Sequence, residues 1–556
     1  MSTHHRLPRA VHAALEAIVG AAHVSEDEHV LASHDWFGLG AEPSSRTLIG
    51  KPPGAVVLPA STEEVAAIVK LCNRHGVRFK AHSTGYGNTS GVATAGAVSI
   101  DLRRMNRLEI DAPNRMAVIE PYVTAGQLTS AAMQHHLMCH IIGAGPLHSP
   151  LASATSMAGV GVPGNHTGNN ARNLLSLEWV SPEGEIVRIG SAGSGAGWFT
   201  GEGPGPGFRG MLRGLLGTQG GLGVFTRIGY KLYPWAGPPR LEWTGEHPQR
   251  GVRRPERFAF HHVVFDTWEH MAEATHHLHA GKVATFFART PPAGLAAMCT
   301  ATTRAHYEAY AAGRLPEMAT ARHEKNWSVV LMAWSDEELQ WKEAVFQSIL
   351  DRTGARKLPL PPEIEGPQLA NLLTSVYVAR FMRMGSNATI SLGVLDSSAL
   401  LPKTLEVSRQ ALDDQLRPGG KLLESDSDHN WMWASEGRHF WSENNPPGNR
   451  FDAKSTGAAV EFILRSFLIG EKNPVGLSGF LQGPAADLFG PRLGHANLWM
   501  RRVKNAWDPK NLSDSRSFIS PQPDGLAKVW PVLKHTLFRP RLRPFVRTLM
   551  ARQFDK

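Results

Sequence analysis

Three glycine-rich turns, each placed beside an apparent strand, constrain the fold of this chain most strongly. They are HSTGYGNTSG (82–91), SMAGVGVPGNHTG (156–168) and GTQGGLGVFTRIGYKLYP (217–234). Glycine adopts positive φ and lets the backbone approach a ligand, and successive free N–H groups in such turns form a concavity that binds anions. A single turn of this kind is also typical of an ordinary surface loop. Three that converge would suit a long ligand with a pyrophosphate in its middle, held by backbone N–H groups and hydroxyls because no lysine precedes Lys231 in them.

Two α/β units are predicted around the first and third turns. Ser61 and Glu64 have the capping-box spacing that opens a helix over 61–76, ended by Gly76, and Thr124 is placed to cap a helix over 124–137. The sequence PEG at 182–184 is expected to form the turn of a hairpin. Apolar, β-branched strands are expected at 55–60, 77–81, 97–102 and 115–123.

After Trp235 the character of the sequence changes. Strands such as 257–265 and 327–334 mix with helices such as 404–416, which is typical of α+β organisation, and a closing helix is expected to end at Asp508–Pro509. We therefore divide the 556 residues by a simple scheme. It comprises an N-terminal helical extension (1–49), two α/β subdomains (50–235), an α+β domain (236–490), a C-terminal return (491–525) and a basic amphipathic tail (526–556).

The composition excludes several classes of protein. No run approaches the roughly 18 apolar residues of a membrane span, and the first thirty residues lack the apolar core of a secretory signal, so we expect a cytoplasmic protein. Three scattered cysteines are too few for a disulfide framework or a cysteine-ligated cluster, so any redox chemistry needs an organic cofactor. The net charge of +9 comes with no recognition motif for nucleic acid.

Much of the positive charge lies in the tail, where lysines and arginines alternate with apolar residues. This tail, 526–556, could contact the inner face of an anionic membrane or a partner protein, although Pro540 and Pro544 interrupt it, or it could pack on its own protein. A homodimer is also compatible with the sequence.

Gly159, Gly161 and Gly164 satisfy the G-x-G-x-x-G pattern of nicotinamide-dinucleotide domains. That fingerprint requires a preceding strand and a helix that opens at its third glycine. Here Pro163 precedes Gly164 and NHTGNNARN follows, which does not start a regular helix, so we do not expect a site of this class.

The order and spacing of four segments resemble the FAD-linked oxidase family of vanillyl-alcohol oxidase and p-cresol methylhydroxylase, which includes glycolate- and D-lactate-dehydrogenase flavoproteins. The segments are 53–91, 98–128, 215–234 and 505–518, and the resemblance covers about two fifths of the chain. It implies an α+β fold with an FAD-binding domain of the p-cresol methylhydroxylase type, made of two subdomains and interrupted by a cap domain with an antiparallel sheet.

The resemblance also implies which residues contact FAD. The first turn would wrap the pyrophosphate, the second would pass along the ribityl chain and flavin, and the third would hold the adenine side or the flavin ring. The implied contacts are Ser83, Thr84, Gly85, Tyr86, Gly87 and Asn88, then Ser156, Ala158, Gly159 and Gly161, then Gly220, Gly223, Val224 and Phe225.

Two departures from the family pattern bear on the cofactor. Some relatives attach FAD through a histidine at the position where this chain has Tyr86. Others attach it through a cysteine in the region that corresponds to 145–156, which contains no cysteine here. We therefore expect FAD to be bound non-covalently, unless a cap histidine such as His429 attaches it. The metal motif of glycolate-dehydrogenase-like relatives is absent, with only His495 in its approximate place, so no metal is expected.

The predicted cap offers candidates for the substrate side. The segment 426–450 gathers His429 with other ionisable residues among Trp431, Trp433 and Trp441. In the segment 376–393, strand alternation would let Arg380 project into a cavity and bind a carboxylate, with Tyr377 nearby. We therefore predict His429 as the base and Arg380 and Tyr377 as its partners, although each is also consistent with a packing role.

These observations predict an FAD-dependent dehydrogenase or oxidase that transfers a hydride from a CH–OH carbon to flavin N5. A 2-hydroxy acid is the first expectation for the substrate, and an aromatic or alicyclic alcohol is the alternative. Oxygen, a quinone or a redox protein would accept the electrons. Two rivals remain: a flavoenzyme without net redox change, similar to alkylglycerone-phosphate synthase, and a flavin electron-transfer subunit of a membrane-associated complex.

Overall fold

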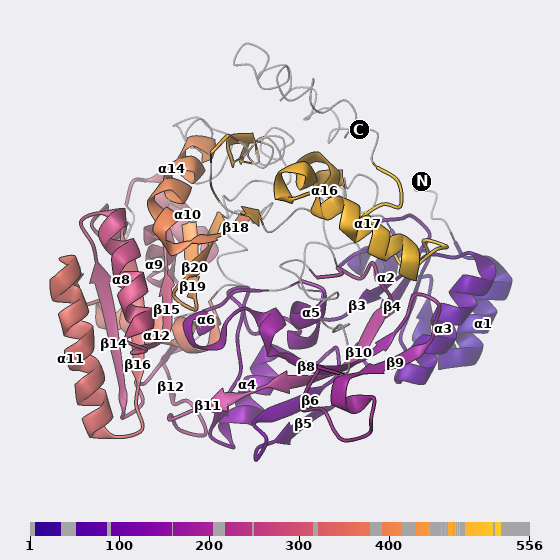
Figure 1. Cartoon of the computed structure of the whole chain (residues 1–556), viewed down its shortest axis with the longest axis horizontal. Coiled ribbons are helices and arrows are strands. Elements are labelled where there is room, and N and C mark those ends of the chain that lie inside the picture. The colour runs from indigo at the N-terminus through magenta and orange to yellow at the C-terminus, as the bar shows by residue number, and fades with distance from the viewer. Residues whose placement is uncertain are drawn as a thin grey trace, which may run out of the picture.

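The protein is described from a computed structural model of the whole chain (Figure 1). The description covers the residues whose placement is defined. These are 6–34, 52–85, 90–157, 159–203, 217–246, 249–314, 321–377, 392–412, 430–444, single residues between 458 and 478, 484–514 and 518–523.

The first sheet has the strand order β1-β2-β4-β3. Its strands are β1 (Val24–Ser25), β2 (Ala55–Val57), β4 (Val98–Asp101) and β3 (Phe79–His82), of which β2 and β3 pair parallel to β4. Helices α1 (Arg9–Val19) and α3 (Thr62–His75) bury their apolar faces in the core of this sheet, and α2 (Glu28–Ser33) lies nearby. The described part of the predicted N-terminal extension therefore joins this subdomain, since β1 pairs with β2.

The second sheet is antiparallel, in the order β5-β6-β10-β8-β9. Its strands are β5 (Leu108–Asp111), β6 (Met116–Ile119), β10 (Val224–Lys231), β8 (Leu174–Val180) and β9 (Ile186–Ile189). Helices α4 (Ala125–Met133) and α5 (Pro150–Thr155) contribute to its core. Strands β7 (Leu137–Met138) and β11 (Tyr233–Pro234) pair beside it.

The third sheet, here called the cap sheet, has eight strands in the order β17-β14-β16-β15-β19-β20-β18-β21, all paired antiparallel. They are β17 (Arg356–Lys357), β14 (Phe258–Val264), β16 (Asn326–Met332), β15 (Ala284–Arg289), β19 (Asn430–Ser435), β20 (His439–Asn444), β18 (Leu392–Ser397) and β21 (Leu477–Ser478).

Helices cover both faces of the cap sheet, because alternate side chains of each strand point to opposite sides. Helices α8 (Trp268–Ala280) and α11 (Asp336–Thr353) pack on one face, and α9 (Pro292–Met298) and α12 (Pro362–Thr374) on the other. Figure 1 shows this layer at the left and the two smaller sheets at the right. The other elements are β12 (Trp243–Thr244), β13 (Gly251–Val252), α10 (Thr303–Ala311) and α14 (Leu401–Leu412).

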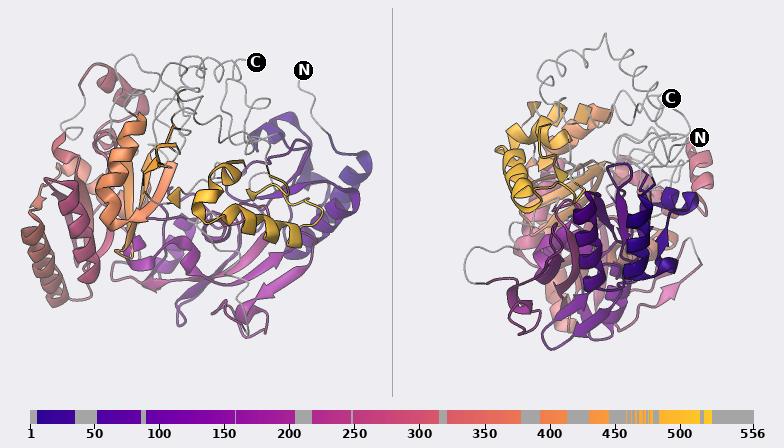
Figure 2. Two further views of the ribbon diagram at one scale, coloured as in Figure 1. Left: turned by 45° about the horizontal axis from the view of Figure 1, so that its top comes forward. Right: turned by 90° about the vertical axis from the view of Figure 1, so that its right-hand side faces the viewer.

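The chain returns to the first sheet at its C-terminal end through α16 (Pro484–Phe489) and α17 (Ala496–Trp507). Phe79 N donates to Leu512 O at 2.9 Å and Asp514 N donates to Phe79 O at 2.9 Å, so this segment extends the edge of the sheet beside β3. Figure 2 shows the return, in yellow, lying against the N-terminal half of the chain.

The local signals in the sequence are confirmed. Ser61 accepts from Glu64 N and Gly76 ends α3 in the left-handed conformation, while Thr124 and Gln127 form a full capping box at α4. At Gly164 only a four-residue helix, α6 (Gly164–Thr167), begins, which is too short for a dinucleotide fingerprint. The α+β fold class with its antiparallel cap sheet is also confirmed. Within the described residues, no helix is both long and apolar enough to cross a membrane.

Candidate functional site

A cleft with about 890 Å³ of atom-free space, partly open to solvent, lies among the predicted turns. Residues of the first turn, of α5 with the loop that precedes it, and of the third turn line it. The turns are far apart in sequence, and the cleft joins them. The sequence analysis predicted that all three turns converge, and the second turn contributes only Ser156 and Met157, at its start.

The third turn needs its glycines for close approach of the backbone. Gly217 has φ +51°, and a Cβ there would lie 2.2 Å from the carbonyl oxygen of Thr155, in the last turn of α5. Gly223 has φ +72°, and a Cβ there would lie 2.2 Å from the carbonyl oxygen of Val180. Any side chain at either position would push the turn away from α5 or β8.

Seven of the predicted cofactor contacts line this cleft. Ser83, Thr84 and Gly85 come from the first turn, Ser156 from the second, and Gly220, Gly223 and Phe225 from the third. Four others, Tyr86, Gly87, Asn88 and Ala158, lie outside the described residues.

The structure gives the other three predicted contacts different surroundings. Val224 is buried in the hydrophobic core of the first sheet, because it points to the opposite side of β10 from Phe225. Gly161 pairs with Ile142, and a Cβ on it would lie 1.8 Å from Ile141 O, so its missing side chain serves backbone packing. A Cβ on Gly159 would likewise lie 2.3 Å from the Ile142 side chain. None of the three is among the residues that line the cleft.

Sequence reasoning missed several lining residues. Lys80 enters from β3 rather than from a turn, and its Nζ donates to Gly91 O at 2.8 Å and lies 3.9 Å from Asp514 Oδ2. Burial lowers the pKa of Lys80 to about 8, an effect that Asp514 partly offsets. Strand alternation in the sequence could have suggested that Lys80 points into the protein. Its partner carboxylate, Asp514, comes from the C-terminal return and is not visible in the local sequence.

The cleft also contains buried polar atoms that have no hydrogen-bond partner among the described residues. They are His148 Nε2, Ser153 Oγ and both amide atoms of Gln219. His148 Nδ1 lies 2.5 Å from Gly145 O, an acceptor, so Nδ1 carries the proton and Nε2 is left as an acceptor. Because unpartnered buried polar groups cost about 1–3 kcal/mol each, their concentration here fits a polar, elongated ligand such as FAD.

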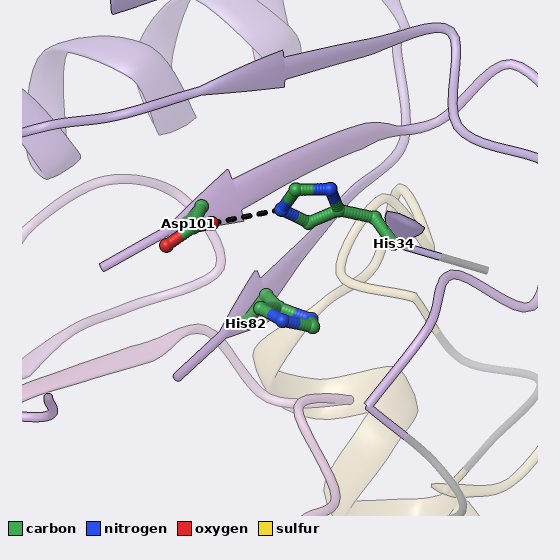
Figure 3. Close-up of side chains that lie close together, drawn as sticks. All are labelled: His34, His82 and Asp101. Atoms are coloured by element: carbon green, nitrogen blue, oxygen red, sulfur yellow. Dashed lines mark hydrogen bonds and ion pairs between the residues drawn. The ribbon is translucent and has the colours of Figure 1, made fainter. Parts of the chain in front are cut away.

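A second cluster of chemically capable residues lies at the start of the first turn (Figure 3). His34 Nε2 lies 2.8 Å from Asp101 Oδ2, and the rings of His34 and His82 are 4.8 Å apart. The potential ligand atoms of these three residues lie within 4.8 Å of one another, so they could in principle hold a metal. Arg103, however, already binds the Asp101 carboxylate at 2.6 Å. A cation at this position opposes metal binding.

This cluster is better explained as a buried hydrogen-bond network. Burial raises the pKa of Asp101, but hydrogen bonds from His34 and Arg103 outweigh this effect and hold that pKa at about 2. Burial lowers the pKa of His82 to about 4. His82 directly precedes the first turn, and its Nδ1 lies 3.3 Å from Ser90 O. The network therefore fixes both ends of that turn.

The predicted substrate residues are placed as follows. His429 and Arg380 lie outside the described residues. Tyr377 is buried, and its hydroxyl donates to Arg250 O, away from the residues that line the cleft. Trp431, Trp433 and Trp441 belong to the core of one cap-sheet face, where they pack rather than line the cleft.

The comparison with known families identifies the cofactor. Residues 53–190 match a family model described as FAD binding domain. FAD is the cofactor of this chain. Together with the relatives and solved structures described next, this match confirms the resemblance to FAD-linked oxidases of the p-cresol methylhydroxylase type.

Curated relatives match about a third of the chain. The D-lactate dehydrogenase of Archaeoglobus fulgidus is 30% identical over 188 residues, which cover 32% of this chain and 38% of that protein. The 4-cresol dehydrogenase [hydroxylating] flavoprotein subunit of Pseudomonas putida is 30% identical over 192 residues, which cover 33% of this chain and 35% of that protein. The matches thus span little more than a third of the length of these relatives.

Solved structures share the fold over nearly the whole chain. A crystal structure of p-cresol methylhydroxylase with substrate bound has a TM-score of 0.74 at 18% identity, covering 93% of this chain and 97% of that one. A 4-ethylphenol oxidase from Gulosibacter chungangensis has a TM-score of 0.71 at 20% identity, covering 92% and 97%. At this identity the likeness shows the fold alone, and it includes the cap sheet.

Proposed function

We propose that this chain is an FAD-dependent oxidoreductase that oxidises a CH–OH group of a small hydroxylated substrate. One observation carries the proposal: a cleft lined by the first and third glycine-rich turns, by the start of the second and by buried polar atoms has a wall, at Ile142–Ala144, on which the cap sheet packs. The flavin, when bound, would supply the hydride acceptor. The chain itself would supply binding, orientation and the removal of a proton.

The residues divide this work between the two halves of the chain. The turn residues Ser83, Thr84 and Gly85 would hold the pyrophosphate through N–H groups and hydroxyls, and Ser156 and the third turn would hold the remainder of the cofactor. Another part of the cleft wall is formed by Ile142 and Ala144, and Gly143 between them packs on Trp433 of the cap sheet. The cap is thus placed to present a substrate to the wall of the cofactor cleft.

The base and the carboxylate anchor are proposed to come from the cap. His429 would remove the hydroxyl proton, and Arg380 would bind the carboxylate of a 2-hydroxy acid. The similarity to a D-lactate dehydrogenase, which covers 32% of this chain, supports a 2-hydroxy acid. An aromatic or alicyclic alcohol is the alternative substrate class.

Anaerobic flavin reduction tests the proposal. The purified full-length protein should be yellow and should bleach when mixed without oxygen with a substrate of the right class, drawn from a panel of 2-hydroxy acids and benzylic alcohols. Oxygen, a quinone or a redox protein should then restore the colour. A colourless protein that does not bind added FAD would contradict the proposal.

The same experiment separates the rival functions. Both a flavoenzyme without net redox change and an electron-transfer subunit would stay yellow with every alcohol. Only the electron-transfer subunit would bleach when a redox protein in its reduced form is added. Cytoplasmic location, contact of 526–556 with a membrane or protein, and dimerisation remain predictions.

A further inference from the structure

Gln219 combines three features that nothing in the proposed chemistry has yet used. Its side chain is buried, with 3% exposure, and lines the cofactor cleft. Within the part of the chain that the structure describes, neither its Nε2 nor its Oε1 has a hydrogen-bond partner. Its backbone has φ +49°, in the left-handed region that glycine usually occupies.

The turn around Gln219 is held firmly in place. Thr218 N donates to Thr155 O at 3.1 Å and Gln219 N donates to Ser156 O at 3.0 Å, so the turn is tied to the end of α5. From the other side, the buried Lys504 Nζ donates to Gly221 O at 2.7 Å. These contacts fix the direction in which the Gln219 carboxamide leaves the backbone.

This arrangement is costly in the absence of a ligand. A non-glycine residue in the left-handed region costs on the order of 1 kcal/mol, and each unpartnered buried polar group costs about as much or more. A glycine at position 219 would avoid both costs, as the glycines at 217, 220 and 223 do at their positive φ angles. The carboxamide is therefore retained for something that enters the cleft.

A carboxamide presents one donor and one acceptor side by side, and it matches a planar ring edge that offers the complementary pair. Adenine offers such an edge through its amino group and the adjacent ring nitrogen, and the flavin offers one through its ring N–H and a neighbouring carbonyl. We propose that Gln219 binds the edge of one of the two ring systems of FAD through two hydrogen bonds. This inference rests on FAD as the cofactor and is independent of the substrate that is oxidised.

The test compares the two halves of the cofactor. Gln219→Met keeps the length of the side chain and removes both hydrogen bonds, so FAD should bind the full-length protein about 10- to 100-fold more weakly. Dissociation constants for FAD, FMN and ADP are measured on protein freed of flavin. Weaker binding of ADP with unchanged FMN identifies the adenine edge, and the reverse identifies the flavin edge. Unchanged binding of all three would overturn the proposal.

Two further variants separate recognition from folding. Ser375→Ala removes a buried hydroxyl, at a residue that also has positive φ, with no hydrogen-bond partner among the described residues; Ser375 does not line the cleft, so FAD affinity should be unchanged. Gln219→Gly relieves the backbone strain, so the flavin-free protein should unfold at a higher temperature while FAD binds more weakly. If Gln219→Gly raises stability and keeps full FAD affinity, the carboxamide has no role in binding. These affinities are measured without any substrate, so they test the role of Gln219 even if no alcohol bleaches the flavin.

Discussion

At the scale of single residues, burial sets the charge state of several histidines. Burial lowers the pKa of His262 and His140 to about 3 and that of His148 and His82 to about 4. These side chains are therefore neutral in the folded protein near pH 7. His261, next to His262, instead lies 2.9 Å from Glu343, because neighbouring residues of β14 point to opposite faces.

Acid should consequently destabilise the protein in a defined window. Below pH 6.5, the ordinary value for histidine, the unfolded chain binds protons that the folded chain takes up only near pH 3–4. Each such histidine therefore lowers the free energy of unfolding by about 1.4 kcal/mol per pH unit as the pH falls from about 6.5 towards 4.

His262→Gln should remove one histidine from this pH dependence. Thermal unfolding of the wild type and the variant is measured at several pH values between 7 and 4, which gives the slope of the free energy of unfolding against pH for each protein. A loss of stability that is the same at every pH does not change this slope. His276→Gln, at an exposed position, is the matched control and should keep the wild-type slope. A His262→Gln slope equal to that of the wild type would show that His262 does not titrate in this window.

At the scale of elements, the C-terminal return clamps the first turn to β3. Asp514 Oδ2 accepts from Ala93 N at 2.5 Å, just beyond the turn, and also faces Lys80 Nζ. Lys80 in turn holds Gly91 O. A strand, a turn and a segment more than 400 positions away in sequence thus share one buried ion pair.

A double-mutant cycle on this pair should show strong coupling. Lys80→Met removes the ion-pair partner of the buried Asp514 carboxylate, and Asp514→Asn removes that of the buried Lys80 ammonium. Each variant should therefore cost about 3–5 kcal/mol of stability. Both should also weaken FAD binding, because the first turn loses its clamp. The double variant should lose less than the sum of the two.

Chemical unfolding and FAD titration of the four proteins in this cycle provide the measurement. Lys70→Met, which removes an exposed lysine on α3, is the control and should be close to neutral. Additive losses in the double variant would mean that Lys80 and Asp514 act separately.

At the scale of the whole molecule, the cap packs on the wall of the cofactor cleft, and one hydrophobic core contains residues of the cap and of the FAD-binding domain. Trp433 packs on Gly143, Phe287 N donates to Val162 O at 3.2 Å, and Arg172 pairs with Glu436. A Cβ on Gly143 would lie 2.3 Å from the Trp433 ring, so the tryptophan fits only over a residue without a side chain.

Gly143→Ala should therefore separate the cap from the cleft wall. Forcing a methyl group into this contact should cost about 1–3 kcal/mol, seen as a lower unfolding temperature and faster limited proteolysis. It should also speed the release of FAD, since Ile142 and Ala144 line the cleft. Gly203→Ala, where no atom of the described residues lies within 4 Å of the added methyl group, is the control. Equal behaviour of the two variants would contradict the role of this contact.

The sequence by itself determined the local elements and the identity of the cofactor. Helix caps at Ser61 and Thr124, the hairpin turn at 182–184 and the three glycine-rich turns depend on residues only a few positions apart, so their signals are complete in short stretches. Their order along the chain was enough to indicate FAD.

Only the tertiary structure decided which side chains face the cleft. It turned Phe225 towards the cleft and Val224 into the core, brought Lys80 together with Asp514, and gave the Gln219 carboxamide no hydrogen-bond partner among the described residues. These outcomes depend on packing between segments far apart in sequence. No short stretch contains both partners of such a contact, so local patterns could not specify them.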